Sequence, residues 1–381
     1  MLENQSHLFN LPNNVTFLNG AYMSPQLKSV SDVGLDMVQL KEHPHKVTSE
    51  HFFEARVTLR KRFAELISAD DYENTAIIPS VSYGMANAAK NCNLQKDDEI
   101  ILIHEQFPSN VYVWQYEAKK VGAKIISIKA PETFENRGKI WNENLLKAIT
   151  SKTKVVSLAH SHWADGTLYD LKAIREATKK FGAKLIIDGT QSVGALPFSV
   201  KEFEVDALVC GGYKWLLGPY GLGMAYYADS LCDGNPIEHN WMNRSGSEDF
   251  SNLVNYQEHY QPKAGRYSVG ESSNFILTPM LTTAIDQLIS WGPKNTQAYC
   301  KSISSDAIKQ LKDKGYFIEN DNYRAHHLFG IYLPSNIDLD ALKTRLIDNN
   351  IIVSYRGKAI RVSPNVYNTK EDFDRFVAQF H

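Results

Sequence analysis

The chain has 381 residues, and its 41 Lys and Arg against 43 Asp and Glu give a formal net charge of −2 at pH 7. Proteins that bind nucleic acid mainly through electrostatics need a clustered excess of basic residues, so this balance argues against that class. With 43% hydrophobic and 22% charged residues, the composition also excludes disordered and fibrous classes. No long apolar run and no signal-peptide pattern is present, so we expect a cytoplasmic protein without a membrane span.

The four cysteines are far apart and form no CxxC pair, so neither a disulfide framework nor a zinc site is predicted. The histidines form no HxxxH or HExxH motif. The pairs His43/His45 and His160/His162 lie two residues apart, a spacing that leaves a metal open but favours an ordinary structural reading. We therefore expect no metal.

From about residue 74 onward, short β-rich apolar runs alternate with amphipathic stretches, which predicts βα units and a mostly parallel sheet. The apolar runs predict strands at residues 75–79, 99–103, 124–128, 154–159, 184–188, 206–209 and 223–227. The amphipathic stretches predict helices at residues 83–91, 110–120, 142–149 and 171–181. The sequence therefore predicts one large α/β domain over residues 21–260, after an N-terminal segment of residues 1–20.

Around residues 232–266 the pattern breaks into polar, turn-rich sequence. Beyond it we expect helices at residues 278–290, 338–349 and 370–380, and strands at residues 328–333 and 351–353. These elements predict a second, smaller α+β domain over residues 261–381.

Polar residues follow several predicted strands, at the edge where open α/β sheets bind ligands. Small hydroxyl residues at 80–84 lead into a helix, which suits a phosphate. Asp188 closes the fifth strand, and Lys214 follows a glycine pair after the sixth. Taken singly, these features are better explained by a helix cap, a loop carboxylate and a surface amine. Together they match what pyridoxal 5'-phosphate (PLP) requires: an amine for a Schiff base, a carboxylate for the ring nitrogen and a phosphate cradle.

The chain resembles fold type I PLP-dependent enzymes of the class V aminotransferase family, which includes cysteine desulfurases, selenocysteine lyases, kynureninase and isopenicillin N epimerase. The resemblance covers almost the whole chain. It is carried by residues 17–21 (FLNGA), 188–194 (DGTQSVG), 212–219 (GYKWLLGP) and 360–369 (IRVSPNVYNT). It implies the PLP-dependent transferase fold, an α/β fold with a large, mostly parallel seven-stranded sheet domain and a smaller C-terminal α+β domain.

The resemblance also implies roles around the cofactor ring. Lys214 would be the catalytic Schiff-base lysine, Asp188 the partner of the ring nitrogen, and Gln191 the neighbour of the ring oxygen. Phe107, in a Phe-Pro-Ser-Asn segment similar to kynureninase's Phe-Pro-Thr-Asp, would stack on the ring.

At the phosphate end, the resemblance implies that Val81 and Ser82, mainly through backbone N–H groups, and Tyr213 hold the phosphate. Residues 270–272 (GES) are similar to a segment that reaches the phosphate from the other subunit. Ser272 would thus complete the site of a homodimer.

On the substrate side, Arg361 would bind the substrate carboxylate through a bidentate pair. Asn19 and Ala21 belong to the segment that resembles the family's substrate-side loop. Trp163, after the fourth strand, would either shape the substrate side or serve as a packing residue.

One departure bears on the reaction. Desulfurases of this family carry a nucleophilic cysteine shortly before the C-terminal arginine, but residues 353–360 (VSYRGKAI) contain none. A persulfide-forming mechanism is therefore disfavoured, and selenocysteine lyase activity less strongly so.

We expect an enzyme that acts on an amino acid or a related amine, by transamination. The alternatives are a lyase, similar to selenocysteine lyase or kynureninase, and an epimerase. Intact Lys214, Asp188 and Arg361 argue against a non-catalytic binding protein.

Overall fold

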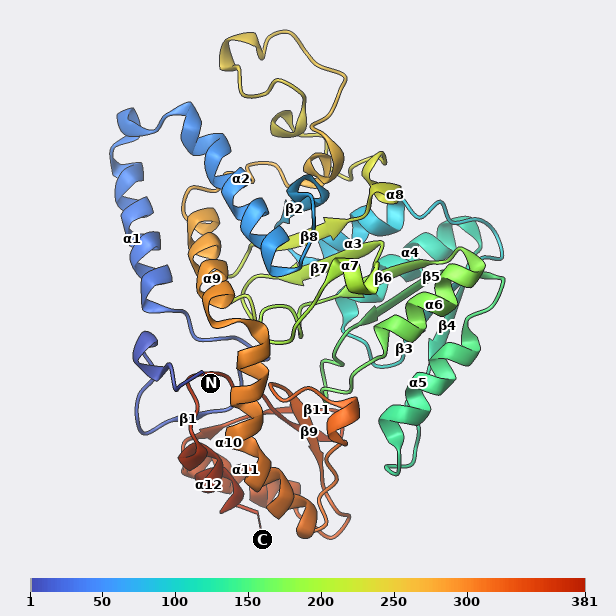
Figure 1. The fold of residues 1–381 in the computed structure, drawn as a ribbon, viewed down its shortest axis with the longest axis vertical. Coiled ribbons are helices and arrows are strands. Elements are labelled where there is room, and N and C mark those ends of the chain that lie inside the picture. The colour runs from blue at the N-terminus through green and yellow to red at the C-terminus, as the bar shows by residue number, and fades with distance from the viewer. Residues whose placement is uncertain (1, 381) are drawn as a thin grey trace.

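A seven-stranded mixed sheet forms the centre of the computed structural model, which describes residues 2–380 (Figure 1). Its strand order is β2-β8-β7-β6-β5-β3-β4. Only β8 runs antiparallel to its neighbours, so the prediction of a mostly parallel sheet is confirmed. The strands are β2 (Thr75–Ile78), β3 (Glu99–Ile103), β4 (Lys124–Ile128), β5 (Thr153–Ala159), β6 (Lys184–Asp188), β7 (Ala207–Gly211) and β8 (Gly223–Tyr227).

Helices cover both faces of this sheet. Alternate strand residues divide the core: Val155 and Ile186 pack on one face, whereas Val156 and Ile187 pack on the other. Central parallel strands are buried on both faces, which is why they read as continuous apolar runs. The first face is covered by α3 (Val81–Lys90) and α4 (Tyr112–Val121). The second is covered by α5 (Arg137–Ala148), α6 (Leu171–Phe181) and the helices described next.

Three long helices were not predicted: α1 (Lys28–Glu42), α2 (Ser49–Leu66) and α10 (Pro293–Asp313). The predicted helix at 278–290 is present as α9 (Leu277–Trp291), and it packs against both α1 and α2. At Gly34, a Cβ atom would lie 2.8 Å from Met280 Sδ, so α1 and α9 approach closely and a larger residue there would have to displace the Met280 side chain. After Gly292, α10 runs on beside the C-terminal elements (Figure 1).

The C-terminal part is built on a three-stranded antiparallel sheet of order β11-β12-β9. Its strands are β9 (Phe329–Tyr332), β11 (Ser354–Arg356) and β12 (Ala359–Val362), and its helices are α11 (Leu339–Asp348) and α12 (Lys370–Val377). The predicted strand at 351–353 is shorter in the structure, as β10 (Ile351–Ile352). It lies outside the three-stranded sheet and pairs in parallel with β1 (Thr16–Phe17). The fold thus has the predicted large and small sheets, while the domain boundaries stay predictions.

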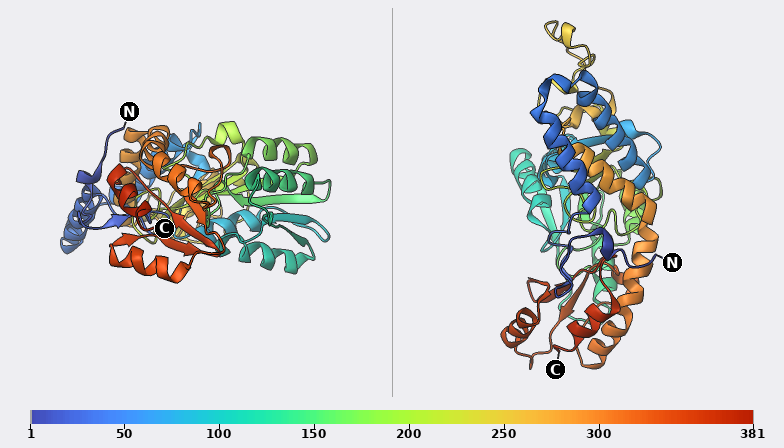
Figure 2. Two further views of the ribbon diagram at one scale, coloured as in Figure 1. Left: turned by 90° about the horizontal axis from the view of Figure 1, so that it is seen from below. Right: turned by 90° about the vertical axis from the view of Figure 1, so that its left-hand side faces the viewer.

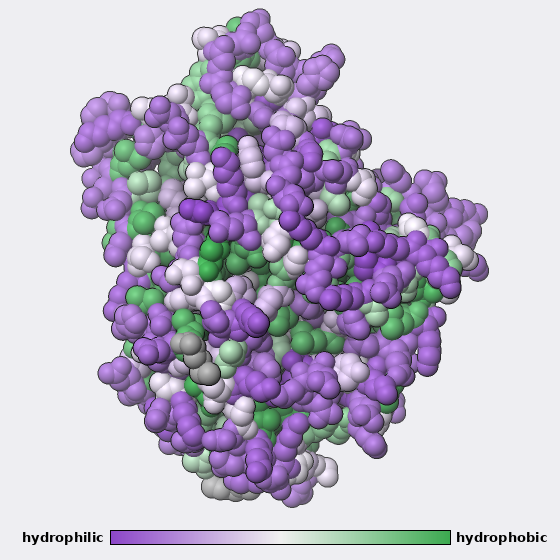
Figure 3. All heavy atoms as spheres, viewed as in Figure 1, coloured by the Kyte–Doolittle hydropathy of each residue, from purple (hydrophilic) through white to green (hydrophobic). Residues whose placement is uncertain are grey.

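The N-terminal segment lies on the C-terminal part, and both chain ends are in the same half of the molecule (Figure 2). Besides the β1–β10 pairing, Gln5 N donates to Val366 O at 2.8 Å. The surface shown in Figure 3 is mostly hydrophilic, with apolar atoms in small patches. Within residues 2–380, no helix is both long and apolar enough to span a bilayer.

The remaining elements are short. Two α-helical turns are α7 (Val200–Phe203) and α8 (Asp229–Cys232). The 3-10 helices are η1 (Ser6–Leu8), η2 (Pro44–Lys46), η3 (Tyr72–Asn74), η4 (Pro108–Asn110), η5 (Trp241–Asn243), η6 (Phe250–Asn252), η7 (Lys263–Tyr267) and η8 (Asp321–Tyr323). The turn-rich stretch predicted around 232–266 contains η5 and η6 and most of η7. Its middle part extends from the body at the top of Figure 1, whereas η7 packs against β2.

Candidate active site

A cavity of about 360 Å³ lies at the carboxyl ends of the central strands, where this class of sheet binds ligands. The loops after β2, β3, β5, β6 and β7 all contribute to its wall. Eight of the residues predicted from the sequence line it together: Val81, Ser82, Phe107, Trp163, Asp188, Gln191, Tyr213 and Lys214. Four do not line it: Asn19, Ala21, Ser272 and Arg361.

Lys214 is buried in this cavity, with 6% of its surface exposed. Its Nζ lies 5.2 Å from the centre of the Phe107 ring and 5.4 Å from that of Tyr213. Burial lowers the pKa of Lys214 to about 8, with smaller contributions from Arg361 and Arg356, while Asp188 acts in the opposite direction. The amine is therefore far more often neutral at pH 7 than an ordinary lysine.

The turn after β7 fixes the position of Lys214. Leu217 N donates to Lys214 O at 3.0 Å, and Gly218 N donates to Gly212 O at 2.8 Å. A Cβ atom at Gly212 would lie 2.5 Å from Leu222 O, so only glycine allows this close backbone approach. The glycine before the lysine thus serves the geometry of the turn.

Asp188 ends β6 with its carboxyl group buried. Its Oδ1 accepts a hydrogen bond from Thr190 N at 2.9 Å. Burial raises the pKa of Asp188 above its usual value, although Thr190 and Lys214 act in the opposite direction. Thr190 Oγ1 in turn accepts from Gly211 N at 3.2 Å, which ties the end of β6 to that of β7. A cation placed beside this carboxylate would be stabilised, because Thr190 and Lys214 compensate the negative charge of Asp188 only in part.

Gln191 lines the cavity, but its side-chain amide is already held. Its Nε2 donates to Ala21 O at 3.0 Å, and its Oε1 accepts from Trp215 Nε1 at 2.8 Å. Ala21 is completely buried, and Asn19 Oδ1 accepts from Ser354 Oγ at 2.6 Å. The N-terminal loop therefore lies behind the cavity wall and supports it.

The N-terminus of α3 forms another part of the cavity wall, with Ser80, Val81 and Ser82. Ser80 is the N-cap, and its Oγ accepts from Tyr83 N at 3.2 Å and lies 3.0 Å from Ser82 Oγ. The first N–H groups of a helix have no partner within it, so those of Val81 and Ser82 are available for an anion. Tyr213 packs edge to face on Tyr220, with ring centres 4.7 Å apart.

Ser272 lies outside the cavity. Its side chain is fully buried within the chain, its Oγ has no hydrogen-bond partner among the described residues, and Thr278 Oγ1 donates to its carbonyl at 3.0 Å. The role expected of Ser272, to reach the phosphate of a second subunit, stays a prediction.

Trp163 separates the cavity from Arg361. Its Nε1 donates to Glu105 O at 2.6 Å, and its ring meets Phe107 edge to face with centres 5.5 Å apart. Behind it, Arg361 Nη1 donates to Trp163 O at 2.9 Å, and Nη2 donates to Ser354 Oγ at 3.4 Å. Burial lowers the pKa of Arg361 to about 9, and Arg356 lowers it further. Trp163 thus lines the cavity and also holds the arginine.

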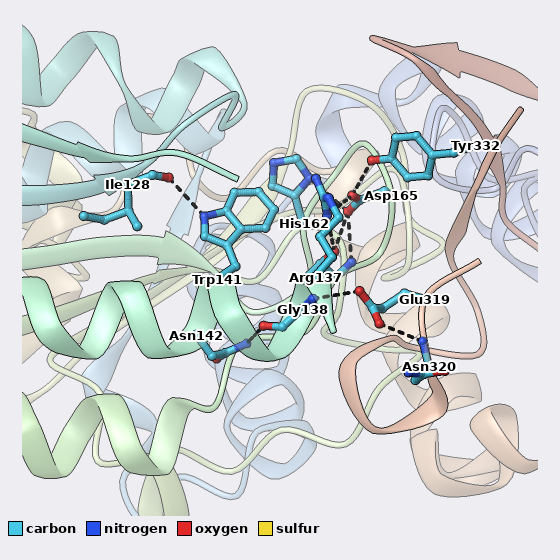
Figure 4. A network of polar contacts seen from close by, with 11 residues as sticks. Ile128, Arg137, Gly138, Trp141, Asn142, His162, Asp165, Glu319, Asn320 and Tyr332 are labelled. Atoms are coloured by element: carbon cyan, nitrogen blue, oxygen red, sulfur yellow. Dashed lines mark hydrogen bonds and ion pairs between the residues drawn. The ribbon is translucent and has the colours of Figure 1, made fainter. Parts of the chain in front are cut away.

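A buried polar network, which the sequence did not indicate, anchors the loop that carries Trp163 (Figure 4). Asp165 Oδ2 accepts from Arg137 Nη1 at 2.9 Å and from Tyr332 OH at 2.7 Å. His162 Nδ1 lies 3.2 Å from Asp165 Oδ1. A Cβ atom at Gly330 would lie 2.7 Å from Asp165 Cβ, so glycine lets the small sheet approach this loop. The network therefore joins α5, the loop after β5 and β9.

Sequence reasoning also missed several lining residues: Gln106, Ser109, His162, Thr190 and Tyr220. Gln106 is the most informative, because its Nε2 donates to Asn110 O at 2.8 Å while its buried Oε1 has no hydrogen-bond partner among residues 2–380. Its position beside Phe107 was the only available signal. Within residues 2–380, no three His, Cys, Asp or Glu side chains gather as a metal site would require.

Comparison with known proteins agrees with this geometry. The aminotransferase class-V family model matches residues 39–376. An uncharacterized aminotransferase of Bacillus subtilis (strain 168), YcbU, is 29% identical over 319 residues, which cover 82% of this chain and 80% of that protein. A probable cysteine desulfurase of Borreliella burgdorferi is 26% identical over 409 residues, covering 96% and 87%.

Solved structures share the fold. A structure of C-DES with glycine covalently linked to its PLP cofactor has a TM-score of 0.86 at 19% identity and covers 98% of each chain. The cysteine desulfurase CsdA of Escherichia coli has a TM-score of 0.80 at 17% identity, covering 98% of this chain and 96% of that one. The chain therefore belongs to the aminotransferase class V family of PLP-dependent, fold type I enzymes.

Proposed function

We propose that this chain is a PLP-dependent enzyme that acts on an amino acid or a related amine through Lys214, and that it catalyses transamination. The observation that carries the proposal is the buried Lys214 amine, close to Phe107 in a cavity whose wall also contains Asp188. The cavity fits the cofactor chemically, because it offers an amine, a carboxylate, an aromatic ring and the N-terminus of α3.

In this proposal each group has one task. Bound PLP supplies an electron sink for the pair released when a bond at the substrate Cα breaks. Lys214 holds the cofactor and moves the Cα proton, a role helped by its lowered pKa. Asp188 keeps a proton on the ring nitrogen, and the free N–H groups of Val81 and Ser82 bind the phosphate. Arg361 orients the substrate carboxylate from behind Trp163.

The cofactor proposal is tested by the visible absorption band of the protein purified with PLP, compared with that of Lys214→Ala. We expect the band in the wild type and in the exposed-lysine control Lys358→Ala, and its loss in Lys214→Ala. If the wild type has no such band, or if Lys214→Ala keeps it after dialysis, the proposal is wrong.

Transamination is favoured over sulfur transfer through an enzyme persulfide because the chain has no suitable thiol. All four cysteines, Cys92, Cys210, Cys232 and Cys300, are buried, and burial raises the pKa of each. The segment before the C-terminal arginine, Arg361, is a short turn between β11 and β12. It contains Arg356, Gly357 and Lys358 but no cysteine. A reactive thiolate needs exposure and a lowered pKa, and none of these thiols meets those requirements.

The type of reaction is tested by following an amino acid labelled with 15N at its amino group. In a transaminase, keto acid beyond one equivalent per bound PLP forms only when a 2-oxo acid is added, and the label moves to the new amino acid. A lyase instead releases an inorganic or small leaving group without an acceptor, and an epimerase returns the substrate with its Cα configuration changed. Either of these results would replace transamination with the corresponding alternative.

We also propose that the enzyme is a homodimer. The support is the open side of the cavity, where Tyr220 lines the wall while 70% of its surface is exposed. Light scattering of the PLP-loaded protein should give twice the mass of the chain. A monomer that binds PLP with full occupancy would contradict this proposal, together with the role predicted for Ser272.

A further inference from the structure

A second arginine lies beside the substrate side of the cavity. The guanidinium carbon of Arg356 lies 5.6 Å from the centre of the Trp163 ring, on its face. Arg356 ends β11, and in the described chain the only hydrogen bond of its side chain runs from Nη1 to the carbonyl of its neighbour, Tyr355, at 2.7 Å. It is half-buried, whereas Arg361 is almost fully buried.

The register of the β11–β12 hairpin brings the two arginines to the same face. Ser354 pairs with Arg361 and Arg356 pairs with Ala359. Residues directly opposite in an antiparallel pair share a face, as do residues two apart on one strand. Arg356 and Arg361 therefore point to one side of the small sheet, the side that packs against Trp163 and its loop.

These two cations have no acidic partner. Within residues 2–380, neither guanidinium lies within ion-pair distance of a carboxylate; Arg361 bonds a carbonyl and a hydroxyl, and its Nε has no partner. Glu105, in the loop that holds Trp163, is exposed, and its carboxylate lies 4.0 Å from His104 Nδ1 instead. Two neighbouring guanidinium groups without an anion repel each other, so a ligand that supplies anions is favoured here.

The charges at this end of the site can be balanced by one kind of ligand. The α-carboxylate of an amino acid would neutralise Arg361 and leave Arg356 uncompensated. We propose that Arg356, stacked on Trp163 beside Arg361, recognises a second carboxylate, so that the enzyme prefers amino acids with an acidic side chain to their neutral amides. This inference rests on the proposed function, since it takes the cavity as the site of an amino acid.

The experiment compares an unreactive dicarboxylate with its neutral counterpart. Glutarate and its monoamide are titrated calorimetrically into the PLP-loaded protein. A charge-assisted hydrogen bond predicts that glutarate binds roughly ten- to a hundredfold more tightly. Arg356→Gln should abolish this preference and Arg356→Lys should keep part of it. Lys358→Gln removes a positive charge two residues away and should leave the preference unchanged.

The steady-state constants provide the second measurement. The ratio of kcat/KM for L-glutamate to that for L-glutamine should fall at least tenfold in Arg356→Gln, mainly through the KM for glutamate. Equal affinities of the wild type for the two ligands, or a preference that survives Arg356→Gln, would overturn the inference. The absence of the visible cofactor band in the wild type would instead contradict the proposed function, so the two failures are distinguishable.

Discussion

Lys214 illustrates how a single residue gains reactivity from its surroundings. Burial removes water from the ammonium group, and the nearby guanidinium groups of Arg356 and Arg361 disfavour the charged form further. Asp188 partly restores the charge, which keeps the pKa of Lys214 at about 8 rather than lower. The pKa of the Lys214 amine thus lies close to neutral pH. Its charged form can still attract an anionic cofactor.

The first prediction concerns the pH dependence of cofactor attachment. The unprotonated amine is the nucleophile, so the rate at which PLP joins Lys214 of the cofactor-free protein should rise about tenfold per pH unit below pH 8 and level off above it. Borohydride trapping followed by peptide mapping measures this rate. Nα-acetyl-lysine in solution, titrating near pH 10.4, is the control. A Lys214 rate that still rises through pH 10 would contradict the assigned environment.

The second prediction concerns Arg361. Arg361→Lys keeps the charge but removes the planar fork that now contacts Trp163 O and Ser354 Oγ. We expect the KM for amino acids to rise roughly tenfold or more, while PLP affinity stays within about twofold. Arg62→Lys, at an exposed ion pair, is the control. Equal loss of cofactor affinity would show that Arg361 acts at the cofactor rather than at the substrate.

Among single residues, those that follow strands were the most predictable. Asp188 and Lys214 stand next to strong apolar runs and glycines, so their place at the sheet edge could be inferred. Arg356 could not, because it became significant only through the hairpin register that places it beside Arg361. Gln106 was equally hidden, since its unpartnered Oε1 is a property of packing.

At the scale of elements, the N-terminus of α3 forms part of the cavity wall, whereas the β11–β12 hairpin lies next to Trp163, which itself lines the cavity. The first turn of α3 presents N–H groups and a partial positive charge, which attract an anion. The hairpin presents two guanidinium groups. The large sheet supplies Asp188 at the end of β6 and Lys214 in the turn after β7. In the proposed function, the cofactor phosphate and the substrate carboxylates would thus be bound by different elements.

The third prediction tests the backbone of α3. Val81 is the first helical residue, where proline is tolerated, and Ser80 before it is extended at φ −162° and ψ 160°, as a proline requires. Val81→Pro removes one N–H group, so we expect PLP affinity to fall roughly tenfold with helicity unchanged by circular dichroism. Ser49→Pro at the same position of α2 is the matched control, and it should leave affinity unchanged. Unaltered affinity in Val81→Pro would exclude this N–H group from the phosphate site.

Elements differed in how far the sequence predicted them. Strands β2, β5 and β6 are buried on both faces, which produces clear apolar runs. Helix α1 gave little signal, because only Val30 and Gly34 of its 15 residues are buried. In α10 the buried face includes polar residues such as Thr296 and Ser304, which obscured its periodicity.

At the scale of the molecule, the network that anchors the Trp163 loop is assembled from distant parts of the chain. Arg137 precedes Asp165 by 28 residues, and Tyr332 follows it by 167. No local pattern could have revealed this cluster. Its effect is to join the small sheet to the loop that carries Trp163.

The fourth prediction concerns this connection. Asp165→Asn leaves the buried Arg137 without its carboxylate, so the free energy of unfolding should fall by about 3–5 kcal/mol. Asp233→Asn, at a fully exposed side chain, should change it by less than about 0.5 kcal/mol. Denaturant titration measures both. A loss below about 1 kcal/mol in Asp165→Asn would mean that the network contributes little to stability.

The sign of the pH dependence follows from the same group. Burial alone would raise the pKa of Asp165, but His162, Arg137 and Tyr332 outweigh it and hold the pKa well below its usual range. The stabilisation is therefore fully present above the unfolded value of about 4 and is lost as the pH falls below it. In Asp165→Asn this part of the acid dependence should disappear.

The pairing of β1 with β10 also has a consequence for the order of folding during synthesis. Next to this pairing, Asn19 Oδ1 accepts a hydrogen bond from Ser354 Oγ, 335 residues later. At translation rates of about 5–20 residues per second, that stretch takes roughly 20–70 s to synthesise. The cofactor cavity depends on segments made by residue 222, so it can form while the N-terminal strand is still unpaired. A nascent chain would thus contain every residue that lines the cavity well before Arg356 and Arg361, the two arginines proposed to bind the substrate, are synthesised.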